Sequence, residues 1–113
     1  MENNGNTEYI DLDGGIKRVG GNKDLFKRLL GRYVDGKNFE ALSAALSSGD
    51  MEESARLAHT LKGVSSNLSL DRVAALSADI EQLIKNGVDY SACLEDLKQA
   101  YDITVTKIAE ITN

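Results

Sequence analysis

The only histidine in the 113-residue chain, His59, lies in the run Ala-His-Thr-Leu-Lys-Gly at residues 58–63. Lys62 follows it by three residues and Gly63 by four, and residues with these separations are neighbours on the surface of a helix. On a helix, the three residues would combine an imidazole nucleophile, a positive charge and a gap without a side chain. A reactive group held by a partner could approach the imidazole through that gap.

The apolar pattern around His59 places the ring on the solvent side of a helix. The apolar stripe of this segment consists of Met51, Leu57, Ala58, Leu61, Val64 and Leu68. At about 100° per residue, His59 lies roughly 160° from the middle of the stripe, on the side of Glu52, Ala55 and Ser66. An ordinary surface histidine without a function also fits this position, and that alternative stays open.

Gly63 needs an explanation, because a glycine inside a helix costs about 1 kcal/mol relative to alanine. Close packing against another helix is one explanation, but Gly63 faces away from the apolar stripe. The position favours a role in clearing space above the imidazole. Gly31 has no such neighbour, and there a close helix contact is expected. Lys62 and Ser66 could each donate to a negative group on His59, although plain surface roles fit both residues.

Other histidine chemistries lack their partner residues. Metal binding requires clustered ligands, and one histidine with the distant Cys93 does not supply them. A hydrolase would pair His59 with a nucleophile and an oxyanion hole, and nothing places Cys93 nearby. No glycine-rich phosphate loop follows a strand. Histidine itself remains as the nucleophile, and a phosphoryl group held by another protein is the leading candidate for transfer.

Helices must position these residues, because the apolar spacing is helical from about residue 11 onward. The expected helices are a short one at 13–18, one capped by Asn22, one ending at Ser48, one from Asp50 to about Asn67, one at 71–86 and one from about Ser91. Gly49 and Gly87 are expected to terminate helices, and Glu53 gives the His59 helix a capping-box-like start.

Short connections between these helices predict an all-α fold. We expect an antiparallel, up-down four-helix bundle with one or two additional short N-terminal helices. Residues 9–113 would form this bundle, behind a flexible segment at residues 1–8.

The helix after His59 should contribute a charged neighbour. Counting through the turn near Ser69 places residues 79–82 level with His59 in the antiparallel pair. Glu81 and Lys85 lie on one flank of that helix and Asp79 on the other, and the pattern does not decide which flank faces the ring. A carboxylate there could accept one ring N–H and leave the other nitrogen free to attack.

Composition limits the partners. Thirteen basic and eighteen acidic side chains give a net charge of −5, which argues against nucleic acid and anionic lipid. No apolar run is long enough to span a membrane, and the polar start differs from a signal peptide. Cys93 has no partner for an internal disulfide, which favours a reducing, cytoplasmic setting. Elimination favours a protein partner, and we expect a monomer.

Residues 58–63 together with Ser65, Ser66, Asn67 and Leu68 resemble the signature of histidine-containing phosphotransfer (HPt) domains of two-component phosphorelays. The resemblance covers about residues 10–111 and includes the stretch at 20–25 and the Gly49-Asp50 opening of the histidine helix. Ser69 stands where such domains commonly have glycine, which puts the geometry of that turn in question.

The resemblance implies a phosphoryl carrier rather than an enzyme. His59 would accept the group from a receiver-domain phospho-aspartate and pass it to another receiver domain. Lys62 would help to neutralise the phosphoryl oxygens, and Gly63 would leave room for the donor. Glu81 and Lys85 match a polar and a basic position near the histidine. The receiver, alone or within a hybrid sensor histidine kinase, would supply Mg²⁺, and the chain would need no cofactor of its own.

The partner surface is expected on helices around His59. Small residues, Ala55 and Gly63, would lie beside the ring, and the basic rim would consist of Arg56, Lys62 and Lys85. This local positive charge would favour the acidic mouth of a receiver domain. Ile16 or Val19 could add an apolar part.

Two other functions also fit the sequence. One is a helical protein-interaction module without phosphotransfer, in which His59 is incidental. The other is a phospho-accepting domain cut from a chemotaxis-type or hybrid histidine kinase.

Overall fold

The computed structural model describes residues 9–112, and every regular element among them is a helix. The helices are α2 (Leu12–Arg18), α3 (Lys23–Asp35), α4 (Asn38–Ser48), α5 (Met51–Asn67), α6 (Asp71–Lys85) and α7 (Ser91–Thr112). The expected all-α fold is confirmed. The segment expected to be flexible, residues 1–8, lies outside the described residues.

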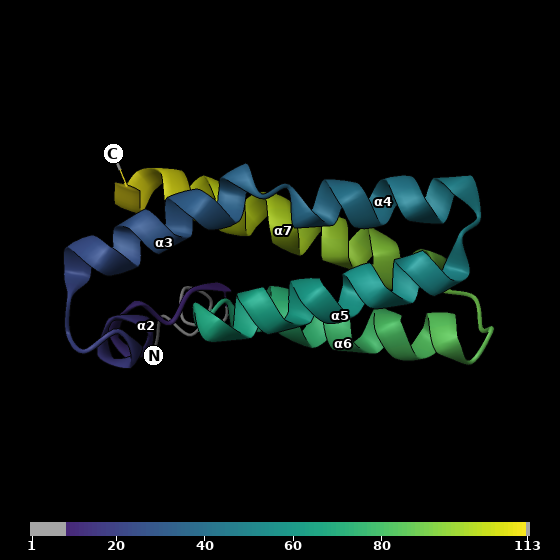
Figure 1. Cartoon of the computed structure of the whole chain (residues 1–113), viewed down its shortest axis with the longest axis horizontal. Coiled ribbons are helices and arrows are strands. Elements are labelled where there is room, and N and C mark those ends of the chain that lie inside the picture. The colour runs from purple at the N-terminus through teal and green to yellow at the C-terminus, as the bar shows by residue number, and fades with distance from the viewer. Residues whose placement is uncertain (1–8, 113) are drawn as a thin grey trace.

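The helices pack as an antiparallel bundle, in which α3 and α4 together take the place of a single long helix (Figure 1). α3 and α4 lie end to end, α5 returns beside α4, and α6 runs back along α5. α7 then closes the bundle against α6 and α3. The short helix α2 lies at one end, beside the start of α3. The up-down four-helix bundle is therefore confirmed, with α2 as an additional short N-terminal helix.

Local interactions fix both ends of α5, the helix that carries His59. At its start, the Asp50 side chain accepts a hydrogen bond from the backbone N–H of Glu53 at 3.1 Å. A complete capping box would also have the Glu53 side chain accept a hydrogen bond from the backbone N–H of Asp50, and this bond is not formed. The Glu53 carboxylate pairs with Arg56, and the backbone N–H of Asp50 donates to the carbonyl of Ala45 at 3.2 Å.

The turn after α5 is closed by a residue in the left-handed region. Ser69 has φ of 59°, a conformation that glycine adopts at lower cost. The N–H of Leu70 donates to the carbonyl of Ser65 and the N–H of Ser69 to that of Ser66, at 2.9 and 3.0 Å. This is the pairing of a Schellman motif. Serine therefore supports the turn that glycine would make, and α6 starts directly behind it.

The hydrophobic core lies between the helices, and α5 and α6 make the most extensive helix contact in it. Ala58 and Leu61 of α5 have no exposed surface. Two serines of α5, Ser54 and Ser65, are also fully buried, although the apolar stripe did not include them. Met51 was expected in that stripe but is 36% exposed, because it lies in a groove between α5 and α6 rather than in the core.

Candidate functional site

His59 projects from the middle of α5, and 68% of its side chain is exposed. The neighbouring residue Ala58 is fully buried in the core, so the backbone that carries the ring is held firmly. The ring is therefore available to a partner without any movement of the bundle. The prediction of an exposed His59 is confirmed.

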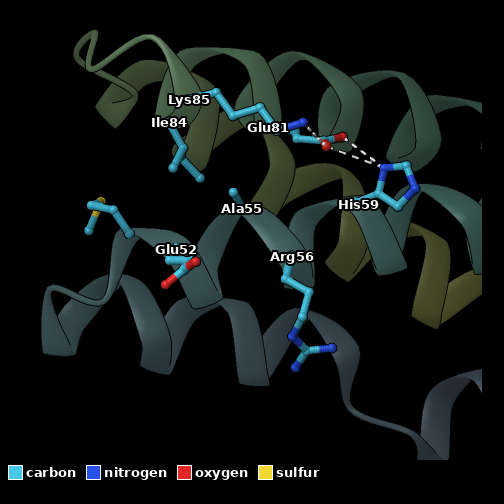
Figure 2. Close-up of a pocket in the computed structure, with 8 residues that line it drawn as sticks. Glu52, Ala55, Arg56, His59, Glu81, Ile84 and Lys85 are labelled. Carbon is cyan, nitrogen blue, oxygen red and sulfur yellow. Dashed lines mark hydrogen bonds and ion pairs between the residues drawn. The ribbon is translucent and has the colours of Figure 1, made fainter.

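Glu81 of α6 holds one side of the imidazole ring (Figure 2). The Nδ1 atom of His59 lies 3.3 Å from Oε1 and 3.2 Å from Oε2 of Glu81. The Glu81 side chain is only 7% exposed, and Nζ of Lys85 contacts Oε2 at 2.9 Å. The flank left open by the sequence is thus the one that carries Glu81 and Lys85. Asp79 lies on the other flank, in a separate groove between α6 and α7.

The pKa of the Glu81 carboxyl lies below its usual value. Burial is the largest single influence and raises the pKa, but hydrogen bonds and charges from Lys85 and His59 together lower it by more. The carboxylate is therefore ionised near neutral pH and can only accept hydrogen bonds. Nδ1 of His59 must donate to it, which places the lone pair of a neutral ring on Nε2. Figure 2 shows the second ring nitrogen pointing away from Glu81.

A groove between α5 and α6 starts at His59 and runs towards the first turn of α5. Its apolar lining consists of Met51, Ala55 and Ile84, and its charged lining consists of Glu52, Arg56, Glu81 and Lys85. Figure 2 shows the charged side chains from both helices around this groove. Three of the expected neighbours of His59, namely Ala55, Arg56 and Lys85, therefore lie together on one side of the ring.

Gly63 lies one turn beyond His59 on the opposite side from this groove. A Cβ atom added to Gly63 would meet nothing within 4 Å, so no other helix packs against the glycine. Close packing is thereby excluded as the reason for Gly63. A Cβ atom at Gly31 would likewise meet nothing within 4 Å, so the close helix contact expected there is wrong. The face of α3 that packs in the bundle is the one that carries the fully buried Leu30.

Two basic residues beside His59 differ in their present contacts. Arg56 donates to Glu53 through Nε at 2.8 Å and through a terminal nitrogen at 2.6 Å. Lys62 is half-exposed and makes no ion pair with any residue in the described range 9–112. The sequence pattern did not reveal the Glu53–Arg56 pair, although a separation of three residues on one helix would have permitted it.

A second depression lies where α2, α3 and α5 meet. Its apolar lining includes Val19, Leu29 and Val64, and Arg18 and Arg32 also line it. Of the two apolar candidates named from the sequence, Val19 lines this depression and Ile16 does not. The sequence placed Leu29 and Val64 only in the apolar stripes of their helices. Their position in this depression depends on how α3 crosses α5, which the apolar pattern does not give.

Within residues 9–112, no group of three or more His, Cys, Asp and Glu side chains is arranged to hold a metal ion. In the same range, no helix is both long and apolar enough to cross a membrane. The arrangement around His59 is instead that of an oriented nucleophile, with one ring nitrogen bonded to a buried carboxylate and the other open to a partner.

Comparison with known proteins identifies the family. The protein-family model named Hpt domain matches residues 36–107 of the sequence. The match covers more than half of the chain and includes His59 and Glu81. Searches of curated proteins and of solved structures return no match. Hpt domains are phosphoryl carriers in the histidine phosphotransfer of phosphorelays. The matched residues span α4, α5, α6 and most of α7, and the chain accordingly belongs to the Hpt domain family.

Proposed function

We propose that His59 accepts a phosphoryl group through Nε2 from the phospho-aspartate of a receiver domain and passes it to a second receiver domain. The hydrogen bond between Nδ1 of His59 and the buried carboxylate of Glu81 carries this proposal. This bond fixes which nitrogen is nucleophilic, and the exposed side of the ring offers that nitrogen to another protein.

The two proteins supply every group that the transfer step requires. The lone pair of Nε2 attacks phosphorus, an Nε2–P bond forms, and the bond between phosphorus and the aspartyl oxygen breaks. The aspartate leaves as a carboxylate. Nδ1 keeps its proton throughout, so the ring becomes positively charged, and the Glu81 carboxylate at 3.2 Å stabilises that charge. Onward transfer is the same step in reverse, with a new aspartate as acceptor.

Lys62 and Gly63 assist this step from the other side of the ring. The unpaired ammonium of Lys62 can move towards the phosphoryl oxygens, because no ion pair with a described residue holds it. The open space at Gly63 gives the loops of the receiver access to Nε2. Both residues are helpers, since neither can replace the nucleophile.

The two depressions on either side of α5 fit a receiver domain as partner. One contains His59 with Arg56 and Lys85, and the other contains Arg18 and Arg32 around an apolar floor. Glu52 and Glu81 balance the two cations of the first depression, whereas no carboxylate of residues 9–112 lines the second. Arg18 and Arg32 therefore complement the acidic mouth of a receiver. We expect the receiver to bring Mg²⁺ together with its aspartate.

The test is transfer from a receiver domain that carries a labelled phosphoryl group. Label on this chain should be acid-labile and base-stable, as a phosphoramidate is, whereas the aspartyl phosphate of the donor is base-labile. His59→Gln should keep the helical circular dichroism of the wild type, because the side chain is largely exposed, and should take up no label. Uptake by this variant at the wild-type level would refute the assignment of His59.

A further inference from the structure

One carboxylate oxygen of Glu81 serves two partners. Oε2 lies 3.2 Å from Nδ1 of His59 and 2.9 Å from Nζ of Lys85. Lys85 is one turn beyond Glu81 on α6, and its side chain runs back onto the carboxylate (Figure 2). The Lys85 side chain is 54% exposed, so packing of the core does not require its charge.

A buried carboxylate beside an imidazole has two opposing effects. It orients the ring, but an unbalanced negative charge at this distance also favours the protonated, cationic ring. A cationic ring has no lone pair on Nε2 and cannot attack phosphorus. Glu81 alone would therefore reduce the population of the nucleophile that it orients.

Few other charges lie close enough to alter this balance. The groove around His59 is lined by α5 and α6 alone, and its remaining charged side chains are Glu52 and Arg56. The guanidinium of Arg56 is held by Glu53, and Glu52 adds a further negative charge. Lys62 of α5 lies three residues from the ring but does not contact Glu81. Lys85 is thus the cation in direct contact with the carboxylate.

We propose that Lys85 is a positioning residue that offsets the charge of Glu81, so that Glu81 orients the His59 ring without converting it to the cation. This inference rests on the proposed role of His59 as the nucleophile. Within the pair Glu81–Lys85, the carboxylate selects the tautomer of the ring, and the ammonium keeps the selected tautomer neutral.

The inference predicts a specific pH effect for Lys85→Met. Without the ammonium, the Glu81 carboxylate beside Nδ1 is unbalanced and should favour the cationic ring, so a smaller fraction of the variant should carry a lone pair on Nε2 at acid pH. Relative to its own alkaline rate, phosphoryl acceptance by the variant should fall further on the acid side of the pH profile than acceptance by the wild type does. Each rate is therefore expressed relative to the same protein's rate at alkaline pH, because Lys85 also lines the groove proposed to face the receiver and its loss can slow acceptance at every pH.

The experiment compares Lys85→Met with Lys85→Arg, which keeps the charge, and with Lys98→Met as a matched control. Lys98 contacts Asp102 at 3.5 Å in another pair four residues apart, exposed and on α7. Ring ¹⁵N spectra of the unphosphorylated proteins are recorded against pH, and the chain has a single histidine, so its signals are unambiguous. Acceptance rates from one phosphorylated receiver are measured over the same range.

A shift of both readouts to higher pH in Lys85→Met, recovery in Lys85→Arg and no change in Lys98→Met are the expected results. A ring titration of Lys85→Met that coincides with the wild type would overturn the inference. So would an acceptance profile that, scaled to its own alkaline rate, coincides with that of the wild type. A shifted ring titration in Lys85→Met, together with no phosphoryl acceptance by the wild type at any pH, would support the charge balance and refute the proposed function.

Discussion

Alanine in place of Gly63 should stabilise the bundle by about 1 kcal/mol, because it replaces a glycine inside a helix. The structure imposes no steric cost against this gain, since an added Cβ atom would meet nothing within 4 Å and the backbone φ is not positive. For a domain of this size, the increase in melting temperature should be about 4 °C. Thermal unfolding followed by circular dichroism measures it.

Glutamine at Gly63 should keep most of that stability and slow phosphoryl transfer. The side chain would start about 5–6 Å from that of His59 and could extend over the ring. Because transfer depends on close alignment of the reacting atoms, we expect the rate to fall by about tenfold or more. Rates are measured as single turnovers from a phosphorylated receiver, per folded molecule.

Gly31 provides the matched control. It also lies inside a helix with open space at its Cβ position, but it lines neither depression beside α5. Gly31→Gln should therefore stabilise the bundle and leave transfer unchanged. Transfer at the wild-type rate in Gly63→Gln would refute the explanation of Gly63 as an approach path, and so would an equal slowing in Gly31→Gln.

Other residues give predictions that concern the fold and its pH dependence. Tyr33→Phe should cost about 1–3 kcal/mol, because the buried hydroxyl of Ser65 loses its partner at 2.8 Å, and the double variant with Ser65→Ala should recover part of that loss in chemical denaturation. The depressed pKa of Glu81 contributes stability that is complete above the usual value of 4.5 and is lost as pH falls through the native pKa. The free energy of unfolding, measured in denaturant at a series of pH values, should therefore fall more steeply in acid for the wild type than for Glu81→Gln. Parallel curves of this free energy against pH would contradict the prediction. Asp50→Ala removes the cap of α5 and should cost about 1 kcal/mol, and an unchanged melting temperature would show that the cap is dispensable.

The ends of the helices could be predicted because capping residues and terminating glycines act within a few residues of the helix end. Asp50 and Asn22 accept hydrogen bonds from backbone N–H groups three residues later, and Gly49 has the left-handed φ of 82° expected of a terminator. Ser69 shows the limit of such signals. A serine rarely adopts φ of 59°, and the turn forms because the following buried residue, Leu70, is drawn into the core.

The candidate site could be predicted only in part, for geometric reasons. Helical periodicity gives the direction of His59 on its own helix and its level relative to the next helix. It does not give the flank of α6 that faces the ring, because that depends on how α6 packs against α5 and α7 together. Glu81 and Asp79 were therefore equivalent in the sequence. The Glu53–Arg56 pair and the openness of Gly31 likewise depend on side-chain and helix positions that a single helix does not determine.

The most direct test of the central claim is the identity of the phosphorylated nitrogen. The chain is labelled with ¹⁵N in its single histidine, charged from a phosphorylated receiver domain and examined by NMR at alkaline pH. The bond between Nδ1 and Glu81 predicts that phosphorus couples directly to Nε2 of His59 and that Nδ1 carries no phosphorus. Phosphorus on Nδ1, or phosphorylation of the chain without any coupling to the imidazole, would contradict it.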